Sequence, residues 1–178
     1  RAEEEANPVH NSGVTSVLWE PPLGKGNRWL GNWQIGSIFT YRTGLPYTVQ
    51  NGIDDANIGW NSQHPNRTAA SLDPPGGRSP QQYFNRAAFS RIQPFTFGDV
   101  GRHTMIGPEQ FSWDFSSMKK FPMPVEGHEL QFRFEAFNFP NRPNFSIPTA
   151  SLSSSSFAVI SSTVTTMREV QLSLKYVF

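Results

Sequence analysis

The C-terminal residues 169–178 alternate strictly between apolar and polar side chains. The residues that would share one face of an extended strand are Val170, Leu172, Leu174, Tyr176 and Phe178. Those that would share the other face are Glu169, Gln171, Ser173 and Lys175. A period of two over this length predicts a β-strand with one apolar and one wet face, and this strand ends on an aromatic residue.

Four earlier segments carry a similar pattern, at 9–19, 32–43, 110–120 and 129–139. The alternation is clearest in 129–139, where Leu130, Phe132 and Phe134 would oppose polar neighbours. In 32–43, Ile38 breaks the rule by falling on the polar face. With 167–178, the sequence predicts five strands, each near the ~9–11 residues that a tilted strand needs to cross a bilayer.

The composition supports strands over helices. Aromatic residues make up 13% of the chain, with 15 Phe, and charged residues only 16%. Aromatic side chains favour a pleated, half-buried surface, and a soluble domain has about 25% charged residues. The net charge of +1 gives no basic surface for nucleic acid, so no nucleic-acid partner is expected. Cysteine is absent, which excludes disulfides and thiolate chemistry within this chain.

The connecting segments alternate in length along the chain. Short connections at 20–31 and 121–128 alternate with long ones at about 46–109 and 140–166. Short turns at one rim and long loops at the other are typical of up-and-down membrane barrels. The sequence therefore predicts an all-β fold: antiparallel up-and-down strands, a fragment of a large outer-membrane β-barrel with one long external loop. We expect a disordered lead at 1–8 and a barrel segment at 9–178.

Aromatic residues would gather at the two ends of these strands, as interfacial girdles do. Near the rim with short turns these are Trp19, Trp29, Trp33, Phe121, Tyr176 and Phe178. Near the opposite rim they are Tyr41, Phe111, Trp113 and Phe139. The alternative is that these rings form the core of a soluble sandwich.

An ordered set of short segments resembles the C-terminal barrel of TonB-dependent outer-membrane receptors, particularly the Oar-like receptors with a carboxypeptidase-regulatory-like domain. The set comprises Trp19-Glu20-Pro21-Pro22, Tyr41-Arg42-Thr43-Gly44, Phe97-Gly98-Asp99-Val100-Gly101-Arg102, Phe132-Arg133-Phe134-Glu135-Ala136-Phe137-Asn138, Asn141-Arg142-Pro143-Asn144-Phe145 and the terminal strand. The resemblance runs from about residue 10 to the end, in the family's order.

The resemblance implies a barrel of about 22 strands with an internal plug, and ligand uptake energised through TonB. With five strands, this chain would be a C-terminal piece of such a receptor in the bacterial outer membrane. Its expected partners are the remaining barrel and plug, the barrel-assembly machinery, and TonB through the parent. Isolated, it would expose strand edges and could form homo-oligomers. The expected barrel-assembly signal is Leu174, Tyr176 and Phe178.

Residues for ligand binding are expected in the long loop, because binding residues concentrate on loops. The candidates are Trp60, His64, Arg67, Arg78 and Tyr83. A weak calcium candidate, Asp54, Asp55 and Asn57, lacks the glycine and the terminal Glu of an EF-hand. A metal site is otherwise not expected, nor is any cofactor.

No catalytic motif is present, so an enzyme is the less favoured interpretation. If the chain is an enzyme, it would be a soluble secreted hydrolase of polysaccharide or ester with a sandwich-like fold. Asp114 and Glu135 would then be the catalytic carboxylates, because paired carboxylates serve glycoside hydrolysis. A self-assembling structural β protein is the third alternative.

Overall fold

The computed structural model describes residues 11–22, 24, 27 and 29–178, and the chain forms two compact units. The sheet unit contains 12–42, 110–144 and 165–178. The loop unit contains 43–109 and 145–164. The lead expected at 1–8 lies outside the described residues.

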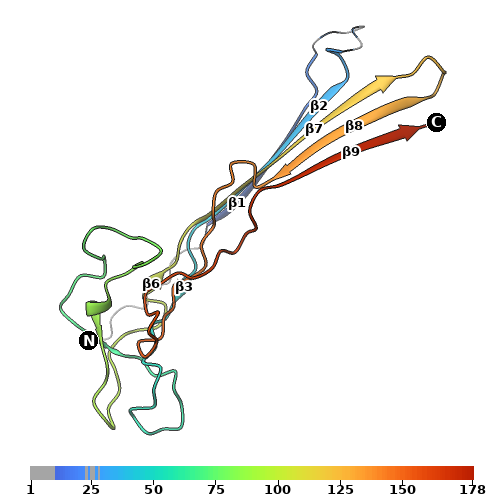
Figure 1. Cartoon of the computed structure of the whole chain (residues 1–178). Helices are drawn as coiled ribbons and strands as arrows, with labels where there is room; N and C mark the ends of the chain where they lie inside the picture. Colours follow the sequence, from blue (N-terminus) through green and yellow to red (C-terminus); the bar gives the residue numbers. More distant parts are fainter. Residues whose placement is uncertain (1–10, 23, 25–26, 28) are drawn as a thin grey trace. The chain divides into compact units, whose positions relative to one another are not determined.

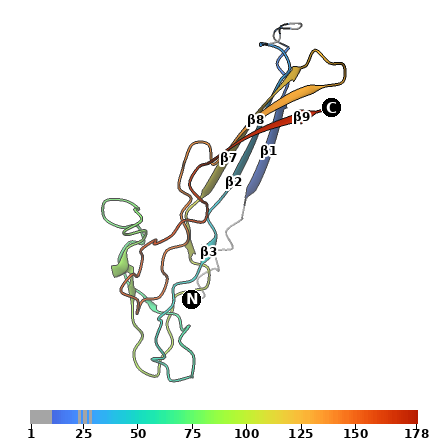
Figure 2. The same ribbon diagram turned by 45° about the vertical axis from the view of Figure 1, so that its right-hand side comes forward.

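The sheet unit is one antiparallel sheet of five long strands. In spatial order they are β1 (Ser12–Trp19), β2 (Trp33–Arg42), β7 (Gln110–Pro122), β8 (Glu129–Phe137) and β9 (Glu169–Val177). Figures 1 and 2 show them side by side in a single layer that does not close on itself. The all-β, antiparallel fold predicted from the sequence is confirmed, and the long strands follow one another as an up-and-down meander.

The strand register collects apolar side chains on one face of the sheet, here called the apolar face. Phe134 of β8 lies opposite Ser117 of β7 and Leu172 of β9, and Leu130 lies opposite Phe121 and Tyr176. Side chains directly opposite each other in a ladder point to the same face, so the aromatic stripes of successive strands merge. The other, polar face carries residues such as Gln131, Arg133, Glu135, Gln171 and Lys175.

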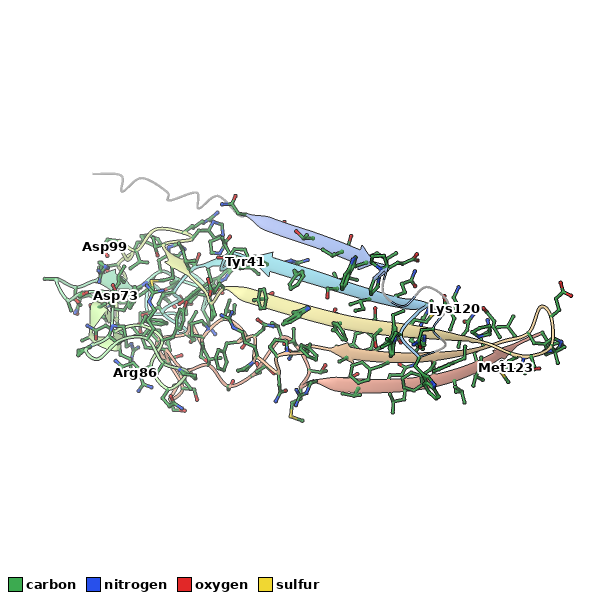
Figure 3. All side chains as sticks on the ribbon, turned by 90° about the horizontal axis from the view of Figure 1, so that it is seen from above. Tyr41, Asp73, Arg86, Asp99, Lys120 and Met123 are labelled. Carbon is green, nitrogen blue, oxygen red and sulfur yellow. The ribbon has the colours of Figure 1, made fainter. Side chains whose placement is uncertain are left out.

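Aromatic rings lie at both ends of the strands, and on the apolar face Phe115 and Phe134 lie between them. Figure 3 labels Tyr41 and Lys120 at these opposite ends. Beyond Lys120, the ring centroids of Trp29 and Phe121 lie 5.9 Å apart. At the other end Trp113 stacks on Phe39 at 5.3 Å and meets Phe139 edge-on at 4.9 Å.

Lys119 is a cation on the apolar face, and it is almost completely buried. Its ammonium donates a hydrogen bond to the backbone carbonyl of Gly31. It also lies 5.2 Å from the ring centroid of Phe121 and 5.5 Å from that of Trp33. These contacts offset the cost of burying a charge, because ring faces and carbonyl oxygens both attract a cation.

The loop unit has its own small core instead of being a structureless connection. Two short pairings, β3 (Pro46–Tyr47) with β6 (Met105–Ile106) and β4 (Asn66–Arg67) with β5 (Phe89–Ser90), tie distant parts of it together. A single 3₁₀ turn, η1 (Arg86–Ala88), precedes β5. The core residues are Tyr47, Val49, Phe84, Ala88, Phe89, Val100, Met105, Phe157 and Ala158. Among the described residues, no helix has the length and apolar character of a membrane span.

Candidate functional site

A hollow of about 470 Å³ opens on the loop unit between two of its segments, 58–64 and 97–102. The first segment contributes Trp60 and His64, two of the ligand candidates identified from the sequence. The second contributes Phe97, Gly98 and Arg102. Small-molecule sites commonly have volumes of about 300–1,000 Å³, so this hollow has the size of a binding site.

The segment that carries Trp60 is held in a closed loop by the carboxylate of Asp54. This carboxylate accepts hydrogen bonds from the backbone N–H groups of Ile58, at 3.0 Å, and Gly59, at 2.6 Å. These bonds, with that of Ile58 the strongest, lower the pKa of Asp54 below its ordinary value of 3.8. The base of the loop is closed by the N–H of Asn51, which donates to the carbonyl of Gln63 at 2.6 Å.

In the structure, the residues considered as calcium ligands stabilise this same loop. Asp55 forms an ion pair with Arg91 at 2.5 Å and accepts a hydrogen bond from the Asn51 side chain at 2.7 Å. The hydrogen bond from Arg91 is the main reason that the pKa of Asp55 is lowered. Asn57 occupies a left-handed turn with φ of 57°. In the described part of the chain, no group of three or more acidic, histidine or cysteine side chains is arranged to hold a metal ion.

The second wall of the hollow is fixed by close backbone packing at Gly98. A Cβ atom at this position would collide with the carbonyl oxygens of His64 and Pro65, so only glycine fits without movement. The N–H of Val100 donates to the Pro65 carbonyl at 3.2 Å, and the His64 ring Nδ1 contacts the Val100 carbonyl. The two walls are therefore bonded to each other, and the hollow is formed before any ligand arrives.

The aromatic side chains at the mouth of the hollow are exposed, unlike those in the core of the loop unit. Trp60 is 66% exposed and Phe97 is 74% exposed, whereas Phe84 in the core is 1% exposed. Neither exposed ring stacks on another described ring, and no described side chain forms an ion pair with Arg102. The hollow thus presents two unoccupied ring faces and an available guanidinium.

The other loop candidates do not line the hollow and are used within the fold. Arg67 donates to the carbonyls of Ala70 and Ala88, each at 3.0 Å. Arg78 forms an ion pair with Asp73 at 2.9 Å, and its guanidinium lies 5.2 Å from the Tyr83 ring centroid. Figure 3 labels Asp73 in the loop unit. The structure therefore brings together two of the five candidates and leaves the other three elsewhere.

Phe97 and Arg102 were not among the sequence-derived ligand candidates. The segment 97–102 entered the sequence analysis only as part of the family resemblance. A signal was nevertheless present, because Phe97 and Arg102 flank two glycines, Gly98 and Gly101, in a segment without the alternation of a strand. The pairing of this segment with Trp60 depends on long-range backbone bonds that have no local sequence signature.

Asp114 and Glu135 border one hollow of about 400 Å³ on the polar face of the sheet. Asp114 accepts a hydrogen bond from the N–H of Asn138 at 2.9 Å, and Glu135 forms an ion pair with Arg133 at 3.5 Å. Apolar Leu18, Ile38 and Phe137 share this hollow, although they lie on the polar face. The two carboxylates thus line the same hollow, and each has a hydrogen-bond or ion-pair partner of its own.

The residues expected as an assembly signal lie on the apolar face of β9. Leu174 is opposite Phe132, and Tyr176 is opposite Leu130. Leu174 is 67% exposed and Phe178, just beyond the strand, is 89% exposed. His128 in the turn before β8 contacts the Tyr176 hydroxyl through its Nδ1 at 2.5 Å. The terminal aromatic residues therefore present an accessible apolar surface at the end of the sheet that carries the short turns.

Comparison with known proteins agrees with the antiparallel sheet of long strands described above. Residues 4–171 match the family model described as an outer membrane beta barrel domain. Searches of curated proteins and of solved structures found no match. The family match covers most of the chain, including all of the polar and apolar alternation up to β9. The chain therefore belongs to the outer membrane beta barrel domain family and is located in the bacterial outer membrane.

Proposed function

We propose that this chain forms part of the barrel wall of a TonB-dependent receptor, in which the loop unit contacts the ligand to be taken up. The observation that carries the proposal is the asymmetry of the sheet. Both segments of the loop unit connect strands at the same end, where β2 and β8 finish and β7 and β9 begin. The opposite end carries only short turns, which is the arrangement of external loops and periplasmic turns in outer-membrane barrels.

The proposal gives the two faces of the sheet different roles. The apolar face, with exposed Leu172 and Leu174, would meet lipid. The polar face would line the barrel interior, where the plug of the parent and the strands completing the barrel would lie. The free edges of β1 and β9 need these further strands as partners, because an open sheet edge is not tolerated in lipid.

The decisive experiment uses the full-length parent purified from outer membranes. The parent should bind the purified periplasmic domain of TonB, and uptake in cells should stop when TonB is deleted. The matched control is a parent that lacks its TonB-contacting segment but keeps this barrel region. A parent that assembles in the outer membrane without binding TonB would exclude the receptor function and leave a barrel of another kind.

A hydrolase is a weaker candidate, since a soluble secreted enzyme does not fit an outer-membrane location. An activity of Asp114 and Glu135 within the barrel is tested by Asp114→Asn and Glu135→Gln in the parent. If the parent hydrolysed a polysaccharide or ester and both variants lost that activity, the parent would be an enzyme as well as a receptor. We expect uptake to be unaffected by either neutral substitution, because neither side chain lines the hollow of the loop unit.

A further inference from the structure

We propose that the hollow between 58–64 and 97–102 binds a small acid that carries a flat ring. The ring would lie against Trp60 and Phe97, and the acid group would lie beside Arg102. The inference rests on the proposed function, in that it specifies the class of ligand which the receptor would recognise. The hollow itself is a property of the structure and can be tested without uptake.

The ring part of the ligand follows from the way this unit uses its aromatic residues. In the core, Phe84 packs edge-on against Phe89 at 5.6 Å and against Phe157 at 5.0 Å. Trp60 and Phe97 stay outside this cluster and expose most of their surface at the mouth of one hollow. Burying such rings against a flat partner removes apolar area from water, and stacking adds a preference for planar groups.

The acidic part follows from the charges around the hollow. In the loop unit, Arg67, Arg78 and Arg91 each have a carbonyl or carboxylate partner. Arg102 has no such partner among the described residues, and it lines the hollow. No Asp or Glu is among the residues that line it, and the nearby Asp54 carboxylate is bonded to the N–H groups of Ile58 and Gly59. A guanidinium binds carboxylate and phosphate groups through paired hydrogen bonds.

His64 adds a second polar contact from the opposite wall. Its Nδ1 faces the backbone carbonyl of Val100, so this nitrogen carries the proton and donates. The remaining ring nitrogen, Nε2, is then an acceptor in the neutral ring and suits a hydroxyl of the ligand. The hydrogen bonds of Asp54 and the close packing at Gly98 hold both walls in place, which reduces the ordering cost of binding.

The test is a calorimetric titration of the full chain in detergent micelles. The probes are two flat-ring acids, phenyl phosphate and benzoate, each compared with a neutral counterpart of the same ring, phenol and benzamide. We expect each acid to bind at least about tenfold more tightly than its neutral counterpart, because a charge-assisted hydrogen bond has this effect. The preferred acid identifies whether the acid group is a phosphate or a carboxylate.

Substitutions assign the binding to named residues. Arg102→Gln should weaken the acids by about 10- to 100-fold and leave the neutral rings unchanged. Trp60→Ala should weaken both members of a pair, while Trp60→Phe should retain most of the affinity. Arg86→Gln is the matched control, since Arg86 is an exposed arginine of the same unit that does not line the hollow. Figure 3 labels it.

Equal affinity for acids and neutral rings, or equal effects of Arg102→Gln and Arg86→Gln, would overturn the inference. Its failure is distinguishable from failure of the receptor function. Acid binding that depends on Arg102 in a parent without TonB-dependent uptake would support the ligand class and remove the receptor function. TonB-dependent uptake by a parent that binds none of the four probes would support the receptor function and exclude the proposed ligand class.

Discussion

Leu172→Arg tests which face of the sheet meets lipid. Leu172 lies at the middle of β9, opposite Phe134 on the apolar face, and is 64% exposed. An arginine at the bilayer midplane of an outer-membrane barrel costs about 2–4 kcal/mol. Because 1.4 kcal/mol is a factor of ten, the ratio of folded to unfolded barrel should fall by about 30- to 1,000-fold.

Gln171→Arg is the matched control, one residue away in the same strand. Its side chain lies on the polar face opposite Glu135, so the new guanidinium gains a carboxylate neighbour. We expect a change within about 0.5 kcal/mol, the usual range for surface substitutions. The assay is urea unfolding of the parent in phospholipid vesicles, followed by the heat-modifiable mobility of the folded barrel. If Gln171→Arg were as destabilising as Leu172→Arg, the assignment of the two faces would be wrong.

The remaining predictions concern the loop unit and the C-terminus. Phe84→Ala should destabilise the loop unit by about 3–5 kcal/mol, because it removes the most buried ring of the core; limited proteolysis would show early cleavage within 43–109. Gly98→Ala should cost about 1–3 kcal/mol and weaken ligand binding, since the new methyl group meets two backbone carbonyls. Because the pKa of Asp54 is lowered in the folded chain, its stabilisation of the 54–59 loop is complete above pH 3.8 and is lost as the pH falls through the lowered value. Tryptophan emission should report this change, and Asp54→Asn should abolish it. Removal of Phe178 should reduce the amount of folded parent in the outer membrane without changing its synthesis, and equal folded amounts would exclude an assembly role.

The long strands were predictable because their signal is local. In β8 every second residue is apolar, and the observed bounds Glu129–Phe137 lie inside the predicted 129–139. The hydrophobic pattern fixes the register as well, since a slip by one residue would turn Phe132 and Phe134 to the polar face. The connection lengths then set the order of strands in an up-and-down meander.

The loop unit was not predictable in the same way. Its short strands contain two residues each, and its core joins Phe84 to Phe157, which β7 and β8 separate in the sequence. Such contacts leave no periodic pattern, so the sequence indicated only a long loop rich in Asn, Pro and Gly. Two residues that line the hollow, Trp60 and His64, were among the candidates predicted from the sequence, because binding residues concentrate on loops. Arg102 became a candidate only from the structure, which places it at the hollow without an ion-pair partner among the described residues.

A residue that breaks the alternation of the sheet also needs the structure to explain it. A charge on the apolar face would normally be expelled, yet Lys119 is buried there, between the rings of Trp33 and Phe121 and against the carbonyl of Gly31. These partners come from the turn before β2, from the start of β2 and from the end of β7, so the lysine links that turn to the sheet. Its position one residue from the exposed Lys120 places it at the rim, where a long side chain can hold its ammonium near the polar boundary of a bilayer. A departure from the pattern at the strand end is therefore consistent with an interfacial position, whereas the same lysine at the level of Leu172 would contradict a lipid-facing sheet.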